Sequence, residues 1–209
     1  MVESLIVAII AYLIGSINFS VILSKKMAGF DVREKGSGNA GTTNMLRTVG
    51  KKAAAITLIC DILKGVVAIL IAILIGKIVE ESNSALLVQI AGVAVILGHT
   101  FPIFFKFKGG KGVATSLGVL IMSNWQIGLI CLVFALVLMA LTQMVSVGSI
   151  AAAILYPVLT LFIPQNYIVP GNYLIYSIIL AVLIVFNHRE NVKRLLNGTE
   201  NKISFKGTK

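Results

Sequence analysis

The segment GSGNAGTTN, residues 36 to 44, sets three glycines among small hydrogen-bonding side chains. Gly36, Gly38 and Gly41 match the G-x-G-x-x-G spacing of dinucleotide-binding loops, and Asp61 follows where the ribose-binding acid would stand. Glycines also allow tight turns in which consecutive backbone N–H groups converge on a single phosphate. The segment therefore predicts nucleotide binding, a simpler phosphate site, or only a flexible Gly/Asn turn.

A second group of small and basic residues is GHTFPIFFKFKGGKGVAT, residues 98 to 115. It resembles a P-loop, but a Walker A motif needs glycine where Phe105 stands and serine or threonine where Gly112 stands. Nucleoside triphosphate chemistry therefore lacks support. Lysines on a glycine-rich turn still suit a phosphate, and the alternative is an ordinary basic loop beside anionic lipid.

The third group, FNHRENVKRLLNGTE, spans residues 186 to 200. His188 and Asn191 lie where an apolar segment ends, at the predicted membrane interface. Lys193 and Arg194 are expected to meet lipid headgroups from an amphipathic segment.

Two isolated polar residues also stand at the ends of apolar segments. His99 closes one such segment and could help chemistry or only bond a carbonyl. Ser146 opens another, where interhelical hydrogen bonding is the alternative to substrate contact.

Composition decides which elements can position these groups. The chain of 209 residues is 57% hydrophobic and 12% charged, with a mean hydropathy of +0.97, as is typical of membrane proteins. A bilayer span needs about 20 mostly apolar residues. We therefore predict an all-α bundle of seven transmembrane helices in a single integral domain, residues 1–209: 2–23, 53–76, 84–105, 112–123, 125–141, 145–163 and 169–187. The fourth is short, and the first lacks the features of a cleaved signal.

This layout excludes the dinucleotide interpretation, because the fingerprint must follow a buried strand, whereas here it follows a membrane helix. Asp61 falls inside the second span and is expected to pair with Lys64, one turn further along the helix.

Basic residues predict the orientation. Sixteen of the eighteen lysines and arginines lie in residues 24–52, in residues 106–111, and after residue 187. With seven spans these segments share one side, so they are predicted to be cytoplasmic, with the N-terminus outside and the C-terminus inside. The three polar groups, together with the 141–146 loop and the 188–209 tail, then converge on one phosphate-handling site.

The three motifs, in this order between these spans, resemble the PlsY family of bacterial acyl-phosphate-dependent glycerol-3-phosphate acyltransferases, over essentially the whole chain. The resemblance implies transfer of a fatty acyl group from acyl phosphate to the 1-hydroxyl of glycerol 3-phosphate, in the bacterial plasma (inner) membrane. The products would be lysophosphatidic acid and inorganic phosphate, in the first acylation of phospholipid synthesis.

The same resemblance implies the site residues. Catalytic positions would be Ser37, Arg47, His99, Lys111 and Asn191. Substrate-binding positions would be Asn39, Thr43, Asn44, Lys106, Gly109, Gly110, Gly112, Ser146 and His188. Arg47 and Lys111 are assigned to phosphate charge, and the glycine N–H groups to the acyl-phosphate head. Ser37 and Asn191 are assigned to orientation.

The residues also limit the mechanism. A His-x4-Asp acyltransferase motif is absent, since Phe104 stands in the acid position after His99. We expect the donor's own phosphate to accept the hydroxyl proton, with His99 assisting by hydrogen bonding.

The few cytoplasmic acids are too scattered for a metal cage, so no metal or other cofactor is expected and activity should survive a chelator. A CDP-alcohol phosphotransferase is also excluded, because its aspartate-rich motif is missing. The partners are the two substrates and membrane lipid, with no nucleic acid and a functional link to the enzyme that makes acyl phosphate. An anion transporter is the alternative function.

Overall fold

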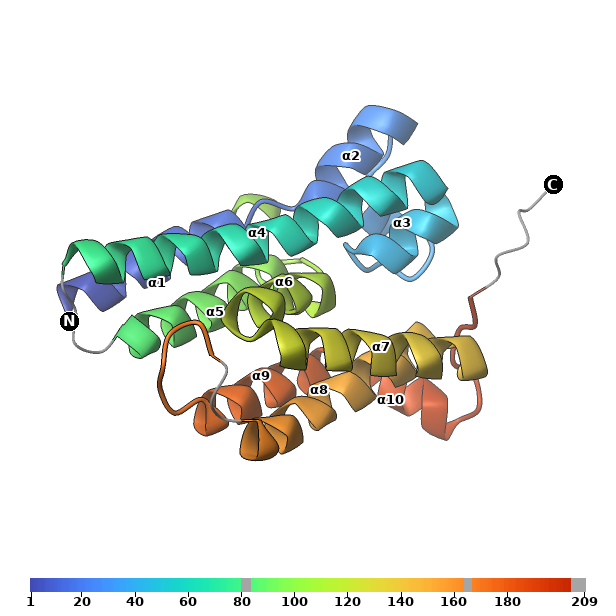
Figure 1. Ribbon diagram of the computed structural model, residues 1–209. Helices are drawn as coiled ribbons and strands as arrows, with labels where there is room; N and C mark the ends of the chain where they lie inside the picture. The colour runs from blue at the N-terminus through green and yellow to red at the C-terminus, as the bar shows by residue number, and fades with distance from the viewer. Residues whose placement is uncertain (80–83, 164–166, 204–209) are drawn as a thin grey trace.

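The computed structural model describes residues 1–79, 84–163 and 167–203, and within them it contains helices and no strands (Figure 1). The helices are α1 (Val2–Gly15), α2 (Phe19–Ala28), α3 (Thr42–Thr48), α4 (Lys51–Ile78), α5 (Ser84–Thr100), α6 (Val113–Ser123), α7 (Trp125–Thr142), α8 (Val145–Phe162), α9 (Leu174–Asn187) and α10 (Arg189–Leu196), with short 3-10 turns η1 (Val32–Glu34) and η2 (Ile103–Phe105). The predicted all-helical class is confirmed.

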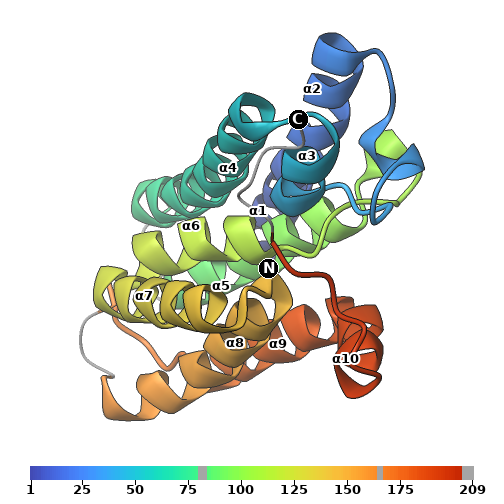
Figure 2. The same ribbon diagram turned by 90° about the vertical axis from the view of Figure 1, so that its right-hand side faces the viewer.

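The long helices run alongside one another, and the short helices gather at one end of the bundle. α1 packs on α5, α4 on α6, and α7 and α9 on either side of α8. α2, α3 and α10 lie at the end opposite the N-terminus in Figure 1, and Figure 2 views the bundle from the side where they lie. The three sequence motifs belong to this end, so the fold brings them together.

Five of the predicted spans coincide with helices long and apolar enough to cross a membrane: Val2–Ala28 (α1 and α2 together), Lys51–Ile78, Ser84–Phe105, Trp125–Thr142 and Val145–Phe162. α9 begins at Leu174, later than predicted, and passes the same test only jointly with α10, across a bend of 60°. α6 has 11 residues. At 1.5 Å per residue it rises about 16 Å, roughly half of a hydrocarbon core. The count of seven spans therefore stays a prediction.

The crossing of α4 and α6 is made by glycines. A Cβ added to Gly118 would lie 2.0 Å from the backbone oxygen of Ile62, and one added to Gly65 would lie 2.4 Å from that of Thr115. The two backbones therefore touch directly, the arrangement that small residues permit between membrane helices. This contact lies near the middle of α4, at the turns of the helix that carry Asp61 and Lys64.

Replacing Gly118 with valine is expected to destabilise the bundle by about 2 to 3 kcal/mol, because the new side chain meets backbone that cannot rotate away. Thermal unfolding in detergent measures the change. Ile121→Val, on the exposed side of the same helix, is the control and should melt close to the parent protein. An unchanged melting temperature for Gly118→Val would contradict the tight crossing.

Candidate active site

The first motif forms a loop between η1 and α3 that is organised by one asparagine. Gly36 and Gly38 have φ values of +61° and +69°, a backbone region that favours glycine. The buried Asn44 side chain accepts a hydrogen bond from the N–H of Ser37 at 2.9 Å and donates to two carbonyls of the same loop. Asn44 was predicted to bind substrate, but its amide also holds the loop that presents Ser37.

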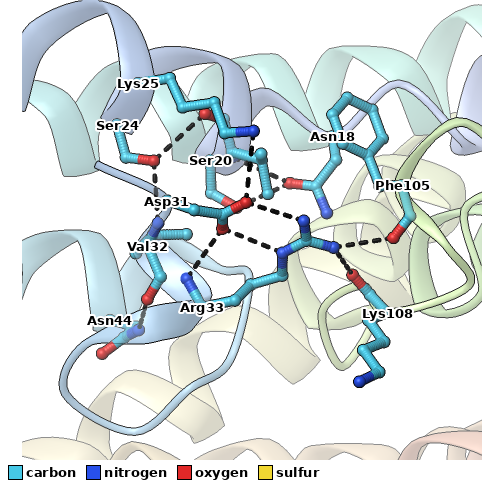
Figure 3. A network of polar contacts seen from close by, with 11 residues as sticks. Asn18, Ser20, Ser24, Lys25, Asp31, Val32, Arg33, Asn44, Phe105 and Lys108 are labelled. Carbon is cyan, nitrogen blue, oxygen red and sulfur yellow. Dashed lines mark hydrogen bonds and ion pairs between the residues drawn. The ribbon is translucent and has the colours of Figure 1, made fainter. Parts of the chain in front are cut away.

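An arginine links the first motif to the second, as Figure 3 shows. Arg33 pairs with Asp31 at 2.8 Å and donates from Nη1 to the carbonyls of Phe105, at 2.7 Å, and Lys108, at 3.0 Å. Hydrogen bonding from Arg33 lowers the pKa of Asp31 to about 2. The network therefore stays charged at neutral pH and positions the glycine-lysine turn.

The glycine-lysine turn folds back onto the end of α5. The N–H of Gly109 donates to the carbonyl of Thr100 at 3.0 Å, and the N–H of Gly110 donates to that of His99 at 3.1 Å. These two groups were expected to bind the acyl-phosphate head, but here they close the turn. Lys106, expected to bind substrate, is exposed and has φ 58°.

The second and third motifs meet at Asn191, which is held by a carboxylate near the end of the described chain. Glu200 accepts hydrogen bonds from Asn191 at 2.7 Å, Ser146 at 2.9 Å and Arg194 at 2.9 Å. Asn191 in turn accepts from the ammonium of Lys111. Burial alone would raise the pKa of Glu200, but the three hydrogen bonds outweigh it and lower that pKa. Arg194 therefore belongs to the site, contrary to the expectation that it meets lipid headgroups.

These groups surround a cavity of about 540 Å³, a size typical of small-molecule sites. Most predicted site residues line it: Ser37, Asn39, Thr43, Asn44, Arg47, His99, Lys111, Gly112, Ser146, His188 and Asn191. Lys106, Gly109 and Gly110 are not among the lining residues. Beyond the polar part the wall is apolar, formed by side chains of α6, α7 and α9 such as Leu120, Leu136, Met139 and Leu180. One cavity thus combines a cationic part with an apolar part.

The ion pair predicted on α4 is confirmed, with Lys64 Nζ 2.9 Å from Asp61 Oδ1. His99 joins it, and both Asp61 and His99 line the cavity. His188 is buried, with Nδ1 2.7 Å from the carbonyl of Ile184. Within the described ranges, no three His, Cys, Asp or Glu side chains gather as metal ligands.

Comparison with known proteins supports one family. The family profile described as "Glycerol-3-phosphate acyltransferase" matches residues 5–198. A glycerol-3-phosphate acyltransferase of Clostridioides difficile is 43% identical, over 97% of this chain and 96% of its own. One of Thermoanaerobacter pseudethanolicus is 46% identical, over 97% of each chain. The chain belongs to the glycerol-3-phosphate acyltransferase family. It is an acyltransferase of the PlsY type.

Solved structures agree with this family assignment. The crystal structure of PlsY (YgiH), an integral membrane glycerol 3-phosphate acyltransferase, in its glycerol 3-phosphate form, is 38% identical with a TM-score of 0.84 and covers 96% of each chain. Its lysophosphatidic acid form is 36% identical, with a TM-score of 0.82, and covers 96% of this chain and 95% of that one.

Two residues of this acyltransferase site were missed in the sequence. Glu200 closes the third motif, but its distance from Ser146 along the chain hides their contact. Arg194 looked like an interfacial residue because it lies in a basic helix. The sequence signal for their pairing was the closeness of Glu200 to the basic residues Lys193 and Arg194.

The buried setting of Lys111 predicts how the activity of this acyltransferase depends on pH. Burial, followed by the positive charge of Arg194, lowers the pKa of Lys111 to about 8. If charged Lys111 binds phosphate, kcat/KM should fall about tenfold per pH unit above pH 8. In the unfolded chain Lys111 keeps its proton up to about pH 10.4. Between about pH 8 and 10.4 the unfolded state therefore binds more protons than the folded state, and the contribution of Lys111 to stability should rise with pH.

Initial rates across pH 6 to about 10, with melting curves in the same buffers, test this expectation. Lys111→Arg is the control, because a guanidinium stays charged throughout and should remove the alkaline fall. A wild-type profile that is flat up to about pH 10 would contradict the assignment of Lys111.

Proposed function

We propose that this acyltransferase moves a fatty acyl group from acyl phosphate to the 1-hydroxyl of glycerol 3-phosphate. The products are lysophosphatidic acid and inorganic phosphate, and the reaction is the first acylation of phospholipid synthesis. The observation that carries the proposal is the cavity itself, in which Arg47 and Lys111 stand at one end and apolar side chains continue from them. Acyl phosphate carries a phosphate and a hydrocarbon chain, so it needs a cationic and an apolar environment in the same cavity.

Cationic and dipolar groups of the cavity suit phosphate. Lys111, Gly112 and Val113 line it where α6 begins, so unpaired N–H groups of the first helical turn lie at the cavity wall. Arg47 supplies a planar guanidinium that can hold two phosphate oxygens at once. Ser37 and Asn39 add hydrogen-bonding groups from the first loop.

The chemistry then needs little more than placement. The 1-hydroxyl oxygen of glycerol 3-phosphate bonds to the acyl carbonyl carbon, and the bond from that carbon to the phosphate oxygen breaks. The hydroxyl proton goes to the departing phosphate. Because acyl phosphate is a mixed anhydride, Arg47 and Lys111 contribute mainly by holding the reactants and stabilising the phosphate charge.

We also propose the membrane arrangement. Seven spans, with α6 as a short one, place the N-terminus outside and the site on the cytoplasmic face of the bacterial plasma membrane, in a single integral domain. Support comes from the gathering of α2, α3 and α10 at one end, together with most of the basic residues. Acyl phosphate would then arrive from the enzyme that makes it, on the same side.

The test is product formation by purified protein in detergent or lipid. Labelled glycerol 3-phosphate is supplied with palmitoyl phosphate and, in parallel, with acyl-CoA or acyl carrier protein. We expect lysophosphatidic acid and phosphate from the first donor alone, at the same rate with a chelator present. Product from acyl-CoA instead would overturn the donor assignment, and no product from any donor would overturn the function.

A further inference from the structure

A buried polar cluster lies where α4, α5 and the end of α1 meet. Asp61, Lys64 and His99 are only 1%, 4% and 4% exposed. The ammonium of Lys64 is 2.9 Å from Asp61 Oδ1 and 2.8 Å from His99 Nδ1. It also donates to the carbonyls of Gly15, at 3.1 Å, and Ile17, at 3.2 Å. Apart from the ring nitrogen, these neighbours are two carbonyl oxygens and a carboxylate oxygen, which suit a charged ammonium.

These contacts assign the proton on the His99 ring. An ammonium has three N–H donors and no lone pair, so the ring nitrogen facing it must accept. Asp61 Oδ1 is 3.6 Å from the same nitrogen, too far to accept a hydrogen bond from it. Nδ1 therefore carries no proton, and the neutral ring carries its proton on Nε2.

The Nε2 atom of His99 lies against the glycine-lysine turn of the site. A Cβ added to Gly110 would come within 2.1 Å of it, so only glycine leaves this nitrogen open. His99 lines the cavity together with Lys111. Over the described ranges, no hydrogen bond occupies Nε2. Among the described residues the ring therefore has an N–H without a hydrogen-bond partner beside the glycine-lysine turn, and no free basic nitrogen.

We propose that Lys64 and Asp61 are positioning residues that hold His99 in its Nε2–H tautomer. His99 then donates a hydrogen bond to a substrate oxygen that carries or develops negative charge, and it removes no proton from the hydroxyl. The role in turnover rests on the proposed function, whereas the tautomer does not. Lys64 also donates to carbonyls at the end of α1, so the experiments must distinguish the positioning of His99 from a purely structural role.

Nitrogen NMR of the full-length protein in detergent tests the tautomer directly. The chain has two histidines, so 15N-histidine labelling gives two rings, and His188→Gln assigns them. We expect His99 to show a protonated Nε2 and an unprotonated Nδ1, and the double variant Asp61→Asn/Lys64→Met to give a mixture of tautomers. A protonated Nδ1 in the parent protein would overturn the proposal, whatever the enzyme assay shows.

Two substitutions of His99 distinguish a hydrogen-bond donor from a general base that removes a proton. Glutamine can donate from about the position of Nε2 but cannot take up a proton, whereas leucine can do neither. With well-folded proteins we expect His99→Gln to keep kcat within about tenfold, and His99→Leu to lose about a hundredfold. Equal losses in both variants would overturn the donor role.

The positioning role is tested with a variant that removes both buried charges. Removing one alone would leave an uncompensated charge in the bundle, so Asp61→Asn and Lys64→Met are combined. We expect kcat to fall about tenfold with KM within about twofold, because the ring loses its orientation while phosphate binding is kept. Lys77→Met, at the other end of α4, is the matched control. Unchanged kcat in the folded double variant would show that the pair serves structure alone.

Discussion

Replacing Lys111 with methionine is expected to lower kcat/KM for glycerol 3-phosphate and acyl phosphate by about 10²- to 10³-fold, the usual effect of removing one charge-stabilising donor. Lys111 lines the cavity, and burial makes its ammonium costly to keep. A bound phosphate would offset that cost, so the interaction strengthens as the phosphate leaves the acyl group. Methionine keeps approximately the apolar part of the side chain and removes the ammonium with its hydrogen bond to Asn191.

Steady-state assays with each substrate varied in turn measure the loss, and melting curves confirm folding. Lys108→Met is the matched control, since this exposed side chain lies three residues away on the same turn and does not line the cavity. It should stay within about twofold of the parent protein. Comparable losses in both variants would show that the basic loop acts only through general membrane electrostatics.

Glu200→Ala is expected to inactivate the enzyme by a different route. Its carboxylate, 4% exposed, accepts from Ser146, Asn191 and Arg194, so its removal leaves three donors without their shared acceptor. We expect a loss of about 3 kcal/mol in stability and at least a hundredfold in kcat/KM, because Asn191 no longer orients Lys111.

Thermal unfolding and activity at a temperature below both transitions measure the two effects separately. Glu190→Ala is the control, because that side chain is 60% exposed and pairs with the exposed Lys193 at the surface. Surface pairs contribute little, so this variant should resemble the parent protein. A Glu200→Ala protein with normal kcat/KM would contradict the assembled network.

The sequence predicted the features that depend on local pattern. Apolar length predicted the helices, and the spacing of Asp61 and Lys64 predicted their ion pair, which the structure confirms. The side of the membrane on which the motifs lie stays a prediction. Convergence of the motifs on one cavity followed from their shared end of the bundle, because successive helices return each loop to the same face.

Features that depend on tertiary contacts could not be predicted in this way. The N–H groups of Gly109 and Gly110 are used by carbonyls at the end of α5, which no spacing reveals. The amide of Asn44 holds its own loop because the carbonyls of Val32, in η1, and of Lys35, directly after η1, lie within hydrogen-bonding distance. Glu200, in the segment after α10, bonds Ser146 near the start of α8, so the two residues are far apart in the sequence.

The position of Glu200 has a consequence for how the protein is made. Chains are synthesised from the N-terminus, and earlier elements can pack before later ones emerge. The helices α1 to α10 all precede Glu200 in the sequence. Ser146, Asn191 and Arg194 can therefore donate to its carboxylate only after the residues that follow α10 have left the ribosome. A chain halted before residue 200 would contain the helices α1 to α10 and still lack the hydrogen bonds of Glu200, so we expect activity to appear only late in biogenesis.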